Sequence, residues 1–280
     1  MARERVLITV KTYPTLSRKY GETVCTAGLR EDGSWMRIYP VPFRRLDEAQ
    51  QYSKYDWIEA DFVRGTFDPR PETFHPVDSR LMVPVGSLDT ADRWRERRKF
   101  VLGRVKLFDR LAPLLDGAKS NTVSLALFKP AKLLDLVIED DEADWPEDKL
   151  AQMRSRAQQG ELFTEDEEWR KTFQLIPKLP FRFRYRFADA DGQTSTLSIL
   201  DWECGQLYWN CLRRCDGDRE IALQKVRQKY LVELPHQRPI FLLGHVTAVP
   251  RLFAESLGNC RGISPAASKS TRAWPRALSI

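Results

Sequence analysis

Asp201 and Glu203 have the residue types and spacing that could do catalytic chemistry. They directly follow a strand-like run, a position in which nuclease carboxylates hold a divalent metal ion. A metal-dependent nuclease or a base-modification enzyme would need a further acid, for which Glu59 and Asp61 are candidates, and usually a lysine that the sequence does not identify. The structural alternative places Asp201 at a helix N-cap and Glu203 in the first turn, where the helix dipole favours an acid.

Motifs for metals and cofactors are not found elsewhere in the sequence. None of the three histidines lies within metal-ligand spacing of another histidine or of a cysteine pair. The sequence also has no phosphate-cradling glycine motif, no G-x-S-x-G and no H-E-x-x-H. We therefore expect no metal and no cofactor, and the leading hypothesis is a protein that binds its partner without catalysis.

The segment from Pro180 to Phe187 alternates aromatic residues with arginines. In an extended chain this alternation places four rings on one face and Arg182, Arg184 and Arg186 on the other. Successive arginines would stand about 6.6 Å apart, which suits contacts with a negatively charged backbone lying along the strand. Any half-buried antiparallel strand gives the same alternation, so an ordinary outward-facing row is the alternative.

A second group of rings and cations lies in the first β-rich region. Trp35, Arg37 and Tyr39 share one face of a predicted strand, with Met36 and Ile38 on the other. Because two apolar side chains suit the inside better, we expect an exposed Trp-Arg-Tyr row. Rings beside cations are typical of a platform for single-stranded nucleic acid. The alternative is that these rings belong to the core.

Charge is distributed unevenly along the chain. Residues 93–110 hold eight cations and two acids, and their predicted helix includes the candidate binding residues Arg93, Arg97 and Arg98. Residues 139–168 hold twelve acids and three cations. This asymmetry suggests a basic face for a polyanion and an acidic segment that folds against that face or docks onto a basic partner protein. Two ordinary solvated helices would show the same charges.

The elements that would position these residues predict an α+β fold. β-rich runs fill residues 1–86, including a hairpin with an Asp-Gly turn at 32–33, and an amphipathic helix follows over 89–110. We expect a small β-barrel domain with the basic helix over 1–115, a mixed α/β domain over 120–257, and a disordered basic tail over 258–280.

Composition indicates a protein of a reducing compartment. The chain has five cysteines, an odd number, and a net charge of +6. There is no apolar run of 18 residues, and we expect no signal peptide. We expect a cytoplasmic protein, bacterial in style, with nucleic acid as its partner and no membrane association.

The predicted hairpin resembles a known signature. Val24 to Leu29 followed by Asp32 to Arg37 resembles the C-x-A-G-[IL]…G-x-W-[IM]-R pattern of dual OB-containing domains and related proteins of bacterial genomic islands. The resemblance implies that the small N-terminal barrel is OB-like, a fold often used on single-stranded nucleic acid. It also implies an accessory or sensor role in a bacterial defence or mobile-element system, with another protein of the same operon as a partner.

Overall fold

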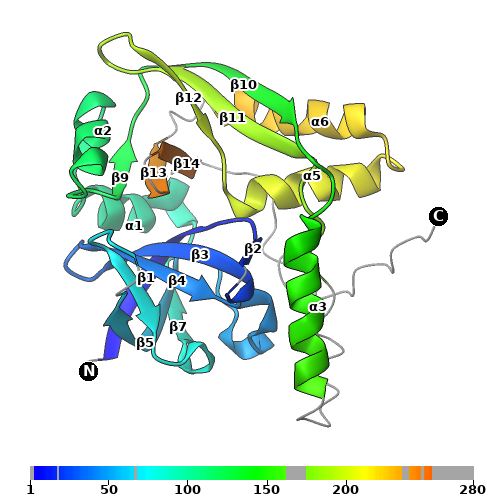
Figure 1. The fold of residues 1–280 in the computed structure, drawn as a ribbon. Coiled ribbons are helices and arrows are strands. Elements are labelled where there is room, and N and C mark those ends of the chain that lie inside the picture. The colour runs from blue at the N-terminus through cyan, green and yellow to red at the C-terminus, as the bar shows by residue number, and fades with distance from the viewer. Residues whose placement is uncertain are drawn as a thin grey trace.

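The computed structural model describes residues 3–17, 19–65, 68–161, 175–234, 240–246 and 249–253. A β-barrel built from the N-terminal strands lies below a mixed α/β half (Figure 1). The predicted α+β class, with an OB-like or small β-barrel region followed by a mixed half, is confirmed. The predicted tail over 258–280 and part of the acidic segment lie outside the described residues. None of the helices in these ranges is long and apolar enough to span a membrane.

Five strands close the barrel, because each pairs with two others in the order β1-β3-β4-β6-β5 and β5 returns to β1. Of these five pairings, only β4 with β6 is parallel. Three successive antiparallel strands with the next strand lying beside the first form a Greek key, and a five-stranded Greek-key barrel is the OB architecture. The strands are β1 (Arg3–Lys11), β3 (Gly21–Arg30), β4 (Trp35–Val41), β5 (Asp56–Arg64) and β6 (Thr73–Pro76).

The predicted hairpin forms the β3–β4 pair. Gly33 in its turn has φ +87°, a conformation that a residue without a Cβ adopts at no steric cost, and Asp32 accepts a hydrogen bond from the Ser34 amide. Met36 and Ile38 point into the barrel core with Val6. The assignment of these two residues to the inner face is therefore confirmed.

Short strands and helices complete the framework. β2 pairs with β3, and β7 pairs with β5 at the edge of the barrel sheet. The helix predicted over 89–110 is shorter, because it ends before Gly103 and the segment after it pairs with β9 as a short strand. These elements are β2 (Thr15–Ser17), β7 (Val83–Ser87), α1 (Ala91–Leu102), β8 (Leu107–Phe108), α2 (Ala112–Lys119), β9 (Leu125–Phe128) and α3 (Glu147–Glu161).

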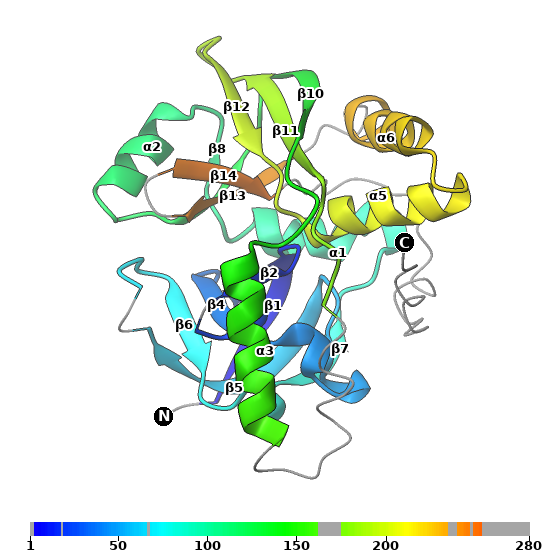
Figure 2. The same cartoon turned by 45° about the vertical axis from the view of Figure 1, so that its right-hand side comes forward.

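The mixed half contains two further sheets, with strand orders β10-β11-β12 and β14-β13-β9-β8. Rings of β11 pack against the next two helices, which lie together on one side of the three-stranded sheet (Figure 2). The helix α6 continues as a π-helix to Glu233. The remaining elements are β10 (Lys132–Asp140), β11 (Phe181–Ala188), β12 (Thr194–Ser198), α5 (Trp202–Arg214), α6 (Arg219–Arg227), β13 (Phe241–Val246) and β14 (Val249–Phe253).

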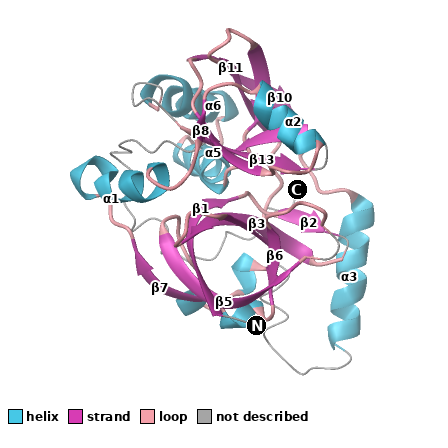
Figure 3. Ribbon diagram, turned by 90° about the vertical axis from the view of Figure 1, so that its left-hand side faces the viewer, coloured by secondary structure: helices cyan, strands magenta, loops and turns pink. Residues whose placement is uncertain are grey.

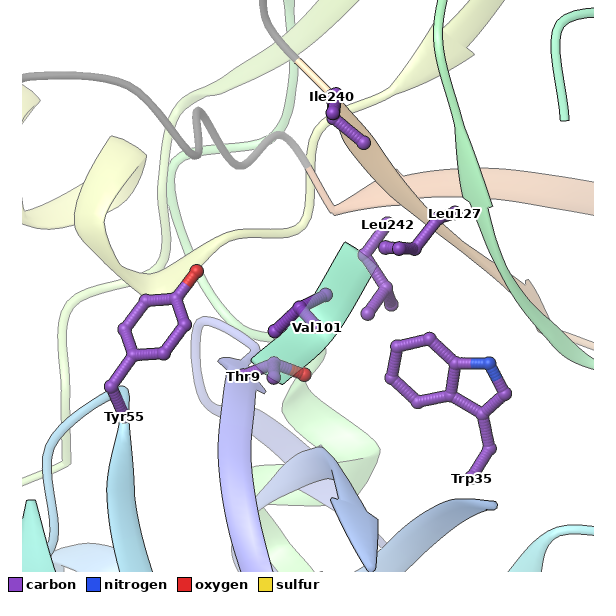
Figure 4. A pocket seen from close by; sticks show the side chains of 7 residues that line it. All are labelled: Thr9, Trp35, Tyr55, Val101, Leu127, Ile240 and Leu242. Atoms are coloured by element: carbon purple, nitrogen blue, oxygen red, sulfur yellow. The ribbon is translucent and has the colours of Figure 1, made fainter. Parts of the chain in front are cut away.

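The outer face of the barrel is covered by the rest of the chain. Leu7 and Leu29 of the barrel share one apolar cluster with Val101 of α1, Leu127 of β9 and Leu242 of β13. α1 and β13 lie above the barrel, and α3 runs down its side (Figure 3). We call the contact between the barrel and residues 107–253 the seam. Its packing leaves a cavity of about 10 Å³, which is close to the smallest space that holds one water molecule (Figure 4).

Candidate nucleic-acid interface

Arg37 lies at the seam and not on an open surface. Its side chain is fully buried, and Nη2 donates to the backbone oxygen of Ser124 at 2.9 Å and to its Oγ at 3.0 Å. Glu72 accepts from the Ser124 amide at 3.0 Å, and no carboxylate among the described residues bonds directly to the guanidinium. Burial lowers the pKa of Arg37, the direction expected for a desolvated cation. The expectation that Arg37 is exposed is wrong.

The Trp-Arg-Tyr row faces outward from the barrel, as expected, but β9 and β13 cover most of it. Trp35 lines the small cavity at the seam together with Leu127 and Leu242 (Figure 4). Tyr39 is half-buried at the other end of β4, where its ring meets that of Tyr20 edge-on at 6.3 Å. The sequence showed which face the row occupies but not the distant strands that pack on it.

The aromatic-arginine segment forms β11, and its alternation is confirmed. The four rings are buried in the core, whereas the arginines lie on the other face. Arg182 Nε is 3.2 Å from Asp141, and Arg184 Nη1 is 2.8 Å from Glu139 on the neighbouring strand. Arg186 is exposed, and it makes no ion pair with any described residue. Carboxylates thus already neutralise two of the three arginines.

The basic helix α1 differs from β11. Arg95, Arg98 and Lys99 are exposed, and none of them makes an ion pair within the described part of the chain. Positions i, i+3 and i+4 lie on one helix face, so these three cations form a single patch. We call Arg95, Arg98 and Lys99 the α1 patch. The sequence identified this helix as basic, but Arg95 and Lys99 were not among the predicted binding residues, although their i, i+3, i+4 spacing with Arg98 is evident from the sequence.

Two other predicted residues of α1 are placed differently. Arg97 is half-buried, with its guanidinium 4.1 Å from the centre of the Tyr55 ring and Nε donating to the backbone oxygen of Leu88 at 2.7 Å. It packs the helix onto the barrel. The backbone of Arg93 belongs to α1, but its side chain lies outside what the structure describes.

The carboxylates Asp201 and Glu203 meet a lysine from the barrel. Lys54 Nζ is 2.8 Å from Asp201 and 3.0 Å from Glu203, and it comes from the segment just before β5. Asp201 occupies the N-cap position of α5, as the structural alternative predicts. Its burial raises the pKa of its carboxyl group to about 6. The lysine that sequence analysis could not identify is therefore supplied across the seam.

The predicted companion acids do not join this cluster. Glu59 faces the arginines of β1, with Oε2 3.4 Å from Arg3 and Oε1 3.2 Å from Arg5. Asp61 follows two residues later on the same barrel strand, paired in register with Arg3. Among the described residues, no group of three or more His, Cys, Asp or Glu side chains is arranged to hold a metal ion.

Family models match both parts of the chain. The model described as Domain of unknown function (DUF8757) matches residues 107–254, which is more than half of the chain. The chain belongs to the DUF8757 family. A second model, Domain of unknown function (DUF8758), matches residues 2–103, so the DUF8757 region begins just after α1.

Comparisons with individual proteins add little to the family assignment. No curated protein matches this DUF8757 member. A similar solved structure is that of a murine DNA binding protein bound with double-stranded DNA, at 13% identity and a TM-score of 0.31. The match covers 91% of this chain and 92% of that chain. Such a low TM-score carries no argument about function.

Proposed function

We propose that this protein binds nucleic acid through the α1 patch. The observation that carries the proposal is the exposure of Arg95, Arg98 and Lys99 on one helix face without ion pairs to other described residues. Each cation that contacts a phosphate releases counterions. Such a patch therefore contributes affinity for a nucleic acid of any base sequence, and this affinity falls as the salt concentration rises. The cations of the other two candidate groups are less available to a polyanion, because Arg37 is buried and two arginines of β11 are paired with carboxylates.

Contacts at α1 are proposed to be with phosphates and not with bases. The rings beside the patch are covered by cations of this protein: Arg97 lies 5.1 Å from the centre of the Trp94 ring, and Arg104 lies 4.2 Å from that of Phe100. Base stacking needs an open ring face. The α1 patch by itself would therefore bind single and double strands alike.

We also propose a preference for unpaired strands, located at two tyrosines of the barrel. Tyr20 is 36% exposed, and its edge-on partner Tyr39 is half-buried, at the end of β4 away from α1. Lys19 Nζ lies 5.0 Å from the centre of the Tyr20 ring, so we propose that an unpaired base stacks on the ring of Tyr39. The proposed accessory or sensor role in a bacterial defence system, with a partner from the same operon, is supported by the sequence resemblance.

Titration of labelled oligonucleotides tests the proposal. A single strand and its duplex are measured by fluorescence anisotropy at about 50 and 200 mM salt. Neutralising the patch in Arg95→Gln/Arg98→Gln/Lys99→Gln is expected to lower the slope of log affinity against log salt by about 2 to 3. The matched control is Arg182→Gln/Arg184→Gln, which removes arginines that are already paired. Millimolar affinity, or affinity indifferent to salt, would contradict nucleic-acid binding.

A further inference from the structure

We propose that a nucleic-acid strand bound at the α1 patch continues onto a second basic group, on the outward face of the sheet β10-β11-β12. This inference deepens the proposed function and rests on it, because the α1 patch holds the first part of the strand. It assigns backbone contacts in the DUF8757 region to Lys132 and Arg186, together with Lys129 in the loop before β10. We call these three cations the sheet patch.

Strand register places Lys132 and Arg186 on the same face of the sheet. Lys132 of β10 pairs with Ala188 of β11, which pairs in turn with Thr194 of β12. Arg186 precedes Ala188 by two positions, so its side chain points to the same side. Side chains directly opposite each other stand about 5 Å apart, and those two positions apart along a strand about 6.6 Å. A lysine, an arginine and a threonine therefore surround the short side chain of Ala188.

This face of the sheet is open to solvent. The rings of β11 and the helices α5 and α6 lie on the opposite side (Figure 2). All three cations of the sheet patch are exposed, and so is Thr194. Within the described ranges, none of these cations makes an ion pair, and Asp135, the acid beside Arg186, is already bound to Arg227. The charge of the sheet patch is thus available to an anion.

A phosphodiester backbone has the chemistry that fits this arrangement. A lysine ammonium is a point charge, and a guanidinium donates two parallel N–H groups to two phosphate oxygens. A threonine hydroxyl is also a common donor to phosphates. The four rings of β11 face the core, so this strand has no ring on which a base can stack. The sheet patch therefore fits phosphates of any base sequence.

Backbone hydrogen bonds connect the sheet patch with the segment that follows α1. Lys106 is exposed, four residues beyond the end of α1 and just before β8. The Lys129 amide donates to the backbone oxygen of Phe108 in β8 at 2.7 Å. The Ala131 amide donates to the backbone oxygen of Ala188 at 3.0 Å. Exposed cations thus follow one another from the end of α1 to the sheet patch.

Acids near this route do not cancel its charge. The Ala190 amide donates to the backbone oxygen of Asp109 at 2.9 Å, which brings this exposed acid to the turn between β11 and β12. Asp191 in the same turn is 3.3 Å from Arg110, so its charge is paired. Lys106 and the three cations of the sheet patch outweigh Asp109.

Salt titration of a labelled single strand of about 20 nucleotides tests the inference. We expect one strand per protein, because one strand contacts both patches. Lys132→Gln/Arg186→Gln should lower the slope of log affinity against log salt by about 1 to 1.5. The matched control is Arg64→Gln/Arg80→Gln, which neutralises two exposed arginines of the barrel and should keep the wild-type slope. Equal slopes in the two variants, or two strands per protein, would overturn the inference.

A lysine footprint of the wild-type protein gives a second test that needs no variant to fold. The full chain, free and saturated with the same strand, is methylated with formaldehyde and cyanoborohydride, and peptide mass spectrometry quantifies each lysine. Lys99, Lys129 and Lys132 should react about threefold more slowly in the complex, because phosphates cover them. Lys225 of α6, an exposed lysine on the other side of the sheet, should keep its rate.

The two tests separate this inference from the proposed function. Protection of Lys99 without protection of Lys129 and Lys132 would overturn the inference and leave binding at the α1 patch standing. Protection of the sheet patch without Lys99, with a wild-type slope in Arg95→Gln/Arg98→Gln/Lys99→Gln, would overturn binding at α1 and leave the sheet patch as the site. A wild-type protein that binds no strand would contradict both.

Discussion

Cations at the seam and cations of the α1 patch are the same residue types in opposite environments. Arg37 and Lys11 lie between the barrel and the DUF8757 region, where protein atoms replace their hydration. Arg95 and Lys99 project from a helix that contacts the barrel through its other face. A seam cation thus interacts with groups of the protein itself, whereas a cation of the α1 patch keeps its charge available to a partner.

The comparison also bears on the use of the OB-like barrel. In OB folds the face of the second and third strands commonly binds oligonucleotides. Here β3 and β4 carry that face, and β9 and β13 cover it. Because this face is packed internally, the proposed contacts with nucleic acid fall on α1.

Charge reversal on the α1 patch is the largest expected effect. Arg95→Glu/Arg98→Glu/Lys99→Glu replaces three phosphate contacts with three repulsions, so affinity for a labelled strand should fall about a thousandfold, or ~4 kcal/mol. The free energy of unfolding should change by less than ~0.5 kcal/mol, because the side chains are exposed and away from the core. Anisotropy and urea titrations measure the two quantities. A large loss of stability with unchanged affinity would show that the α1 patch stabilises the fold and does not bind nucleic acid.

Truncation at the seam should show the opposite result. Arg37→Ala removes both hydrogen bonds to Ser124 and leaves a space at the seam, so the free energy of unfolding should fall by about 3 kcal/mol. The matched control is Arg186→Ala, an exposed arginine whose loss should cost less than ~0.5 kcal/mol. The folded fraction of Arg37→Ala should bind nucleic acid with wild-type affinity. A specific loss of binding would place Arg37 in the interface after all.

Sequence patterns predicted local features better than distant contacts. The alternation in β11 and the Asp-Gly turn before β4 are fixed by neighbouring residues, and both predictions are confirmed. The burial of Arg37 depends on Ser124, which is 87 positions away, and the pairing of Asp201 with Lys54 depends on a segment even farther away. No local period carries such information. The division into domains at 115 and 120, and the binding role of each site residue, stay predictions.

A pH dependence should distinguish Lys11 from a surface lysine. The ordinary pKa of 10.5 describes the unfolded chain, and the folded value is about 7. Between these values the unfolded chain holds one more proton, so stability rises with pH. From pH 7 to 8.5 the free energy of unfolding should rise by about 2 kcal/mol more in wild type than in Lys11→Met. Asp201, with a pKa near 6, stays ionised over this range.

Lys119→Met is the matched control for this measurement, since it also replaces one lysine by methionine, at a side chain that is 78% exposed. Urea unfolding at the two pH values measures the difference. The same slope in wild type and Lys11→Met would mean that Lys11 stays protonated in the folded protein.

Removing the carboxylate partners of the β11 arginines should have the smallest effect. It tests whether ion pairing decides which cations are available to a polyanion. Asp141→Asn/Glu139→Gln removes the partners of Arg182 and Arg184, whereas Asp140→Asn/Glu142→Gln makes the same change in net charge at exposed acids nearby. The first variant should bind a labelled strand about tenfold more tightly at low salt, and the control about twofold. Exposed pairs contribute little stability, so both variants should fold. Equal gains would show that net charge, and not ion pairing, decides which cations of this protein bind a polyanion.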